Sequence, residues 1–192
     1  QGFTWNGTGG SYDQDRIDLW ANYGSHVWSQ DSDFYMILEH WTDNNEEKAL
    51  SDLGFMTWAN VTHDYQEASM GYGSNLAWAS WQERGWNHPR SVSYAESHDE
   101  ERLMYKNLQF GNGNGGYSIT DLETALGRIE LAACFNIPLP GPKMIWQFGE
   151  LGYDYSINTC SDGVTISEDC RVVAKPVRCD YREMPARYRV YQ

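Results

Sequence analysis

Length, composition and charge narrow the classes of function before any motif is considered. With 192 residues, the chain is long enough to bury a substantial core and corresponds to one domain or part of one. Its 14 basic and 27 acidic residues give a formal net charge of −13, which argues against phosphate-backbone binding and so against a nucleic-acid partner. No run approaches the roughly 20 apolar residues of a membrane span, so we expect no membrane partner.

Apolar spacing and turn residues predict helices and short strands that alternate along the first part of the chain. Over residues 13–28, apolar side chains recur at helical spacing. Residues 34–38 form a short apolar and aromatic run, which is typical of a parallel strand buried on both faces. A second helix is predicted to end at Gly54, and residues 55–59 form the next strand. We expect a long polar loop over residues 60–75.

The rest of the chain continues the same alternation. Residues 92–95 are the third predicted strand, and the capping-box pattern of residues 120–123 begins a long helix. Residues 143–147 are the fourth predicted strand, and residues 148–178 form a long loop. A last helix is predicted to begin near Pro185. Strands alternating with helices indicate a parallel sheet with right-handed crossovers.

Two of these strands run into acidic side chains. Glu39 directly follows the strand at residues 34–38, and Asp99 lies in the segment that follows residues 92–95. A barrel of βα units presents its chemistry at the carboxyl ends of its strands. Cleavage of a glycosidic bond requires two carboxylates. Two carboxylates at the ends of different strands would meet that requirement.

The same segments resemble motifs of the α-amylase superfamily of glycoside hydrolases, the family 13 type. Residues 97–100, Ser-His-Asp-Glu, are similar to the family's motif after barrel strand seven, with Ser97 where Asn is commonest. Residues 37–39 resemble the motif after strand five, with Leu38 where Gly often stands. Residues 140–150 resemble the eighth strand and its loop. The order and separation of these segments make the match more specific than any one of them.

The resemblance implies an α/β fold that is half of a (β/α)8 TIM barrel, about strands five to eight, truncated at both ends. A complete barrel takes roughly 250 residues, and four βα units are half of one. We expect residues 1–192 to be the C-terminal part of a single catalytic barrel domain, with the missing N-terminal half as its partner. Because a half barrel has two open sheet edges, we expect the isolated chain to associate or aggregate.

The resemblance also implies catalytic roles. Glu39 is the acid/base, which protonates the leaving oxygen and then deprotonates the incoming water or sugar hydroxyl. Asp99 stabilises oxocarbenium-like charge, His98 donates hydrogen bonds to sugar hydroxyls, and both carboxylates are expected to face one cleft. No Asp here matches the strand-four motif that carries the family's nucleophile. Residues 1–4 look like the sequence that follows that motif in one bacterial branch, so we expect the nucleophile before Gln1 and an inactive 192-residue chain.

Four further residues are candidates for sugar contacts. His63 and Asp64 follow the second strand and fall on the predicted rim. Trp41 and Tyr65 are candidate platforms, because flat aromatic rings stack on sugar faces while their polar tips form hydrogen bonds. The alternative for His63 and Asp64 is a pair within the loop, and the alternative for the two rings is packing in the core.

The leading activity that the resemblance implies is hydrolysis of α-1,4-glucans such as starch and maltooligosaccharides, with retention, in carbohydrate metabolism. Residues 97–100 and 53–55 are also reminiscent of glucan branching enzymes, in which a sugar hydroxyl replaces water as the acceptor. A third reading is a non-catalytic glucan-binding relative. Members of the family often carry structural calcium, but the resemblance assigns no calcium ligand in this segment, and we expect no other cofactor.

The cysteines allow several arrangements. Cys160 and Cys170 flank a polar loop that contains Gly and could form a disulfide if the protein is exported. Cys134 lies on the apolar face of a predicted helix, so we expect a buried thiol, and Cys179 has no obvious partner. No spacing is typical of a zinc site. The cysteines favour an extracellular or periplasmic location.

Overall fold

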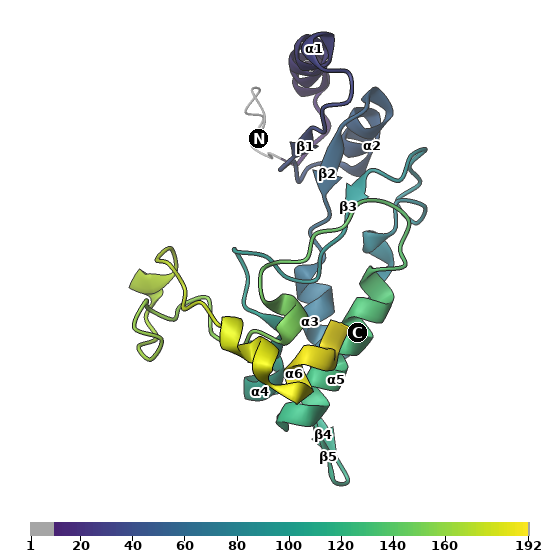
Figure 1. The fold of residues 1–192 in the computed structure, drawn as a ribbon. Coiled ribbons are helices and arrows are strands. Elements are labelled where there is room, and N and C mark those ends of the chain that lie inside the picture. The colour runs from purple at the N-terminus through teal and green to yellow at the C-terminus, as the bar shows by residue number, and fades with distance from the viewer. Residues whose placement is uncertain (1–9, 192) are drawn as a thin grey trace. The chain divides into compact units, whose positions relative to one another are not determined.

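A computed structural model describes residues 10–191, and the chain divides into two compact units (Figure 1). Among the described residues, the first unit takes in 10–60, 77–93 and 139–143, and the second takes in 61–76, 94–138 and 144–191. The resemblance carried by residues 1–4 lies outside the described residues. That both units belong to one catalytic domain stays a prediction.

A small parallel sheet lies in the first unit. Strands β1 (Ile37–Leu38), β2 (Met56–Trp58) and β3 (Ser91–Val92) pair in parallel in that order, and β3 overlaps the predicted strand 92–95 at Val92 alone. Ile37 lies opposite Met56, and Trp58 lies opposite Val92. Beyond β3, Ser93 forms one parallel bridge with Lys143.

The predicted half of a (β/α)8 barrel is wrong. Each parallel strand has two or three residues, and residues 143–147, predicted as the fourth strand, contribute a single bridge. The second sheet is an antiparallel pair, β4 (Gly113–Asn114) and β5 (Tyr117–Ser118). The described residues therefore form a mixed α/β fold with six α-helices and no barrel of eight βα units.

The error has a physical cause. An apolar run shows where a strand can form, but the strand extends only as far as its backbone groups find partners. Of the run 34–38, only Ile37 and Leu38 are paired with β2 as strand residues. The side chain of Tyr35, expected inside a sheet covered on both faces, is 80% exposed.

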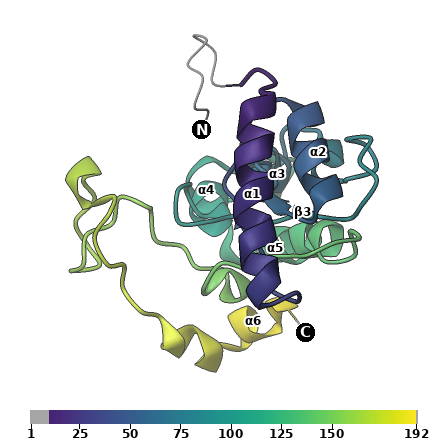
Figure 2. The same cartoon turned by 90° about the horizontal axis from the view of Figure 1, so that it is seen from above.

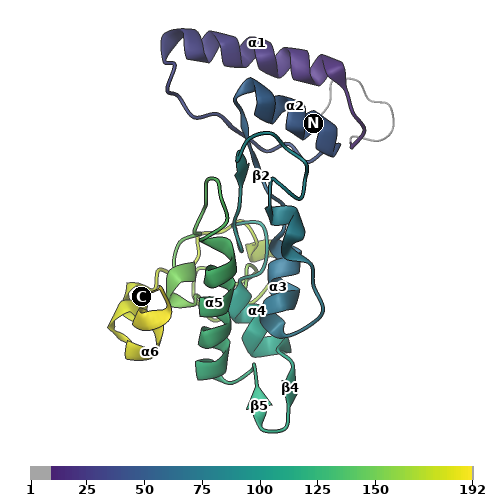
Figure 3. The same cartoon turned by 90° about the vertical axis from the view of Figure 1, so that its right-hand side faces the viewer.

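Two helices pack together in the first unit. Helix α1 (Gln14–Gln30) and helix α2 (Asn44–Leu53) lie side by side in Figures 2 and 3. Ile17, Leu38 and Phe55 are buried in the core between these helices and the sheet, together with Leu50. Gly54 ends α2, as predicted, with the positive φ of 120° that favours glycine.

The second unit is mainly helical. Helices α3, α4 and α5 pack against one another, and α6 packs on α5 (Figure 1). None of the helices within residues 10–191 has the length and apolar character needed to cross a membrane. Their bounds are Thr62–Met70 for α3, Leu103–Phe110 for α4, Leu122–Asn136 for α5 and Pro185–Tyr188 for α6, and the short 3-10 helices are η1 (Leu76–Ala79), η2 (Gly149–Leu151), η3 (Glu168–Cys170), η4 (Cys179–Glu183) and η5 (Arg189–Tyr191).

Two predictions for this unit need correction. Residues 60–75 are not one polar loop, because α3 forms over Thr62–Met70, where Thr62, Tyr65, Gln66 and Ser69 are buried at helical spacing. Cys134 is exposed rather than buried. The buried stripe of α5 passes through Ala133, and the next residue points about 100° away around the helix.

Among the described glycines of the first unit, Gly24 of α1 leaves the least room for a side chain. A Cβ at this position would lie 2.6 Å from the ring of Phe55 and 2.7 Å from the ring of Trp28. We predict that Gly24→Ala lowers the free energy of unfolding by about 1–3 kcal/mol through overpacking, measured by urea denaturation. Gly127→Ala is the matched control in α5, where a Cβ would meet nothing within 4 Å. It should stabilise by about 0.5–1 kcal/mol, and equal effects at both positions would contradict this account.

Candidate functional site

Glu39 directly follows β1, and its side chain is exposed. The next residue, His40, is buried, and its Nε2 lies 2.7 Å from the Glu46 carboxylate of α2. The carboxylate of Glu39 at the end of β1 is therefore accessible, while the contact of His40 with Glu46 holds the backbone directly after it. Accessibility is what a group that exchanges protons with a substrate needs.

The segment after Glu39 is held by a buried carboxylate network. Glu46 is 0% exposed and accepts hydrogen bonds from Arg16 Nε at 2.7 Å, from Arg16 Nη2 at 2.7 Å and from the backbone N–H of Asp13 at 2.7 Å. Burial acts to raise the pKa of Glu46, but the hydrogen bonds from Arg16, His40 and Asp13 outweigh it. The pKa of Glu46 therefore lies below its ordinary value, and the carboxylate is ionised in its network.

The adjacent residue, Glu47, fixes the same segment from a second side. It accepts a hydrogen bond from the backbone N–H of Thr42 at 3.0 Å and pairs with Arg84. Arg84 also lies over the rings of Trp86, at 4.0 Å, and Trp78, at 4.9 Å. Burial raises the pKa of Glu47 despite these partners. Residues 40–42 are thus tied to α2 at two points.

Trp41 lies within this fixed segment. Its indole N–H donates a hydrogen bond to the Trp58 carbonyl at 3.2 Å, while its side chain stays 45% exposed. A ring that is both held and accessible can stack on a flat sugar face. Trp41 therefore remains a candidate platform, two residues after Glu39 in the sequence.

The second candidate group, His98 and Asp99, belongs to the second unit, so its placement in one cleft with Glu39 stays a prediction. Both side chains are exposed, and His98 Nε2 lies 3.5 Å from Asp99 Oδ2. The rings of His98 and Trp146 lie 5.6 Å apart. The backbone N–H of Asp99 donates to Ser97 Oγ at 3.1 Å. The imidazole, the carboxylate and the indole are therefore neighbours.

A buried ion pair closes the loop that carries His98 and Asp99. Arg102 Nη1 lies 3.3 Å from Glu96 Oε1, and the backbone N–H of Leu103 donates to Glu96 Oε2 at 2.8 Å. Burial raises the pKa of Glu96 and lowers the pKa of Arg102. The absence of a side chain at Gly149 leaves room for this pair, because a Cβ there would collide with Glu96 Oε1.

A pocket of about 320 Å³ opens beside His98 and Asp99. Trp146, Tyr153 and Tyr155 supply its aromatic lining. Burial raises the pKa of Tyr153 to about 12, so at neutral pH its hydroxyl keeps its proton, which it donates to the Pro176 carbonyl at 2.7 Å. The pocket is also lined by the amide of Gln147. Aromatic rings next to hydroxyl and amide groups suit a ligand with apolar faces and polar edges, as sugars have.

The remaining sequence candidates lie in the first turn of α3 rather than in a loop. His63 is exposed, and the Asp64 backbone carbonyl accepts a hydrogen bond from Ser74 Oγ at 2.6 Å. Tyr65 is 1% exposed, and its hydroxyl donates to Asn136 Oδ1 at 3.4 Å. Its buried ring offers no face for stacking, and none of the three lines the pocket beside His98.

Sequence reasoning missed the groups that hold the candidates in place. The adjacent acids Glu46 and Glu47 look like ordinary first-turn residues of a helix, which favour its N-terminus. Their burial and their distant arginine partners leave no local signal. The pocket lining had one signal, since Trp146 falls within the segment that resembles the eighth strand of the family.

Two Arg-x-Asp spacings occur in the chain, but neither follows a strand. Asp18 lies within α1, and Asp180 lies within η4, where it pairs with Arg178 at 2.6 Å. Among residues 10–191, no group of three or more His, Cys, Asp or Glu side chains is arranged to hold a metal ion. No protein-family model matches the chain, and no curated protein matches it either.

The Glu96–Arg102 pair generates a stability prediction. Arg102→Met removes the partner of a buried carboxylate, so we expect the free energy of unfolding to fall by about 3–5 kcal/mol in urea denaturation. Arg189→Met is the matched control, because Arg189 pairs with Glu123 at the surface and should contribute no more than about 1 kcal/mol. The double variant Glu96→Gln/Arg102→Met should recover part of the loss, since no buried charge remains. If Arg102→Met and Arg189→Met lowered the free energy of unfolding equally, the account of a buried ion pair would be contradicted.

Proposed function

We propose that this chain carries catalytic residues of a retaining enzyme that cleaves α-1,4-linked glucans such as starch and maltooligosaccharides. Glu39 is the acid/base, and Asp99 stabilises the charge that develops on the sugar. The observation that supports this most is that each residue is an exposed carboxylate on a segment following a parallel strand, and each segment is anchored by a buried Arg–Glu pair.

The chemistry requires one group to lose and regain a proton and another to stay ionised. Glu39 would give its proton to the glycosidic oxygen and then take one from water. Asp99, beside His98, would face the ring carbon as positive charge develops there, while His98 donates to a sugar hydroxyl. The covalent step of a retaining mechanism also needs a nucleophilic carboxylate. No Asp of this sequence lies in a motif that matches the nucleophile motif of the family.

The pocket beside Asp99 supports a carbohydrate ligand. Its lining combines Trp146, Tyr153 and Tyr155 with the polar side chains of His98 and Gln147. A neutral sugar also suits a chain of net charge −13, which would repel anionic ligands. The Cys160–Cys170 disulfide supports an exported enzyme, extracellular or periplasmic, because disulfides persist in oxidising compartments.

A branching enzyme would use the same acid/base, with a sugar hydroxyl in place of water as acceptor. The two activities differ in their products, since branching creates α-1,6 links and releases no reducing ends. The same substrate and assay therefore separate hydrolysis from transfer.

We predict that Glu39→Gln and Asp99→Asn each lower the hydrolysis of soluble starch by at least about 10²-fold, because each removes a proton-transfer or charge-stabilising group. The assay measures reducing ends released by the product of the complete open reading frame that encodes this sequence. Glu83→Gln and Asp121→Asn are matched controls with exposed carboxylates, and they should keep normal rates.

Binding separates the catalytic proposal from a non-catalytic glucan-binding protein. Both site variants should bind maltoheptaose within a few-fold of the unaltered protein, by calorimetry. Near-normal turnover of Glu39→Gln on starch would contradict its role as acid/base. Binding without any turnover in the unaltered protein would favour the non-catalytic alternative.

A further inference from the structure

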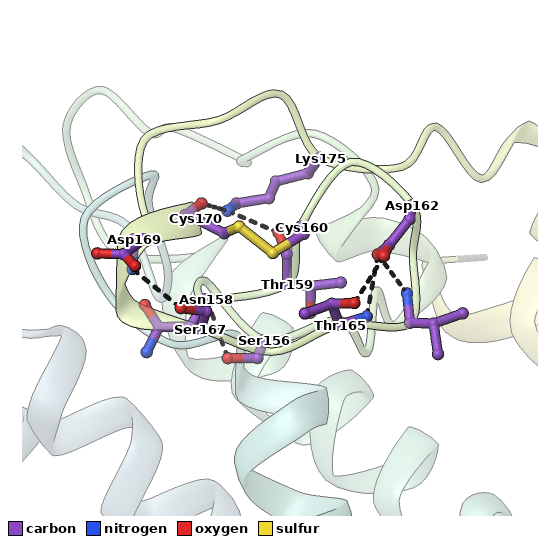
Figure 4. The surroundings of a disulfide bond; sticks show 11 residues. Ser156, Asn158, Thr159, Cys160, Asp162, Thr165, Ser167, Asp169, Cys170 and Lys175 are labelled. Atoms are coloured by element: carbon purple, nitrogen blue, oxygen red, sulfur yellow. Dashed lines mark hydrogen bonds between the residues drawn. A yellow bond between two sulfur atoms is a disulfide. The ribbon is translucent and has the colours of Figure 1, made fainter.

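The segment that follows residue 155 contains a small covalently closed loop. A disulfide joins Cys160 and Cys170, which are ten positions apart, as the sequence allowed (Figure 4). The carboxylate of Asp162 accepts hydrogen bonds from Val164 N at 3.0 Å, from Thr165 N at 2.9 Å and from Thr165 Oγ1 at 2.6 Å. These contacts order a loop whose apolar side chains are mostly exposed.

The chain leaving this loop is bound back onto it. Lys175 Nζ donates to the carbonyl of Thr159 at 3.0 Å and to that of Cys170 at 2.5 Å, a crossing that Figure 4 shows beside the disulfide. Residues 171–175 therefore form a short strap with both ends fixed. Every residue of this strap lines the pocket that contains His98 and Asp99.

Three hydrogen bonds, one from the strap and two from residues 156 and 157, join this part of the chain to the loop that carries Asp99. Arg171, the residue after Cys170, donates from Nη2 to the backbone carbonyl of Asp99. The Glu101 carboxylate accepts hydrogen bonds from Ser156 Oγ at 2.7 Å and from Ile157 N at 2.8 Å. The disulfide is thus one residue away from a direct contact with the candidate stabiliser.

We propose that the strap, residues 171–175, is part of the glucan-binding site. The strap forms the wall of the pocket beside Asp99, and the Cys160–Cys170 bond fixes Arg171 as a positioning residue for Asp99. The proposal rests on the proposed function, because it takes an α-glucan chain as the ligand. It adds a specificity-determining segment whose first residue, Arg171, lies 72 positions away from Asp99 in the sequence.

The exposure of the strap fits this role. Val172 is 91% exposed yet lines the pocket, and an accessible apolar side chain there can contact the apolar face of a sugar ring. Few side chains of the loop or the strap are buried, so local packing contributes little to holding them. The cross-link and the Lys175 and Arg171 hydrogen bonds supply that constraint instead. A wall fixed before binding costs less conformational entropy when the ligand arrives.

The test measures maltoheptaose binding by calorimetry and amide hydrogen exchange over residues 97–101. The variants Cys160→Ser/Cys170→Ser and Arg171→Ala should each weaken binding about tenfold and speed exchange at residues 97–101. Arg171→Ala keeps the disulfide, so the test survives if the cysteine variant does not fold. Arg171→Lys keeps a cationic donor and should restore most of the affinity, which a purely structural role would not require.

Matched controls use the same residue types elsewhere in the second unit. Cys179→Ser alters an exposed free cysteine, and Arg189→Ala removes a surface arginine that pairs with Glu123. Both should bind maltoheptaose normally and keep slow exchange at residues 97–101.

Failure of this proposal differs from failure of the proposed function. If the unaltered protein binds maltoheptaose and the loop and Arg171 variants bind it equally well, the strap is not part of the site. If the unaltered protein binds no glucan, the proposed function is overturned, and the glucan-binding wall with it. Unchanged exchange at residues 97–101 in Arg171→Ala would overturn the positioning role of Arg171 whatever the ligand.

Discussion

Buried carboxylates paired with arginine fix the segments on which both candidate groups lie. In the first unit, Glu46 binds Arg16 and His40 inside the protein. In the second, Glu96 binds Arg102. Removing the partner of a buried charge destabilises a protein by several kcal/mol. Any movement that separates these ion pairs is therefore strongly unfavourable. Each carboxylate also accepts a backbone N–H, which extends the constraint from the side chains to the course of the chain.

The positions of many helices and strands could be predicted from the spacing of apolar residues, but the lengths of the strands could not. Strands β1 and β2 fall inside the predicted runs 34–38 and 55–59, but each covers only the residues that find a paired neighbour. Helix α3 was missed because His63 and Asp64 suggested a loop, although Thr62, Tyr65 and Ser69 are buried at helical spacing. The prediction of a half barrel extended short local signals to an architecture, and the described residues do not form it.

The candidate site divides in the same way. The positions of Glu39 and Asp99 after strands could be read from the sequence, because a strand followed by an acid is a local pattern. Their supports could not. Arg16 and Glu46 are 30 positions apart, and Arg171 and Asp99 are 72 positions apart. The local sequence around one member of such a pair gives no sign of the other. The disulfide between Cys160 and Cys170 is one of the arrangements that the sequence left open, and the structure contains it.

Besides its buried ion pair, the second unit has a further means of support near its candidate residues, a covalent cross-link. Where helices cover the chain, as around Glu46, burial and ion pairing hold the segment, and the neighbouring Glu39 can stay exposed. The segment 160–175 has little buried surface, so no comparable core is available to it. A cross-link restricts the chain without requiring burial, chiefly by reducing the freedom of its unfolded forms. Because such a bond persists only under oxidising conditions, the order that the strap takes from it depends on the redox conditions around the protein.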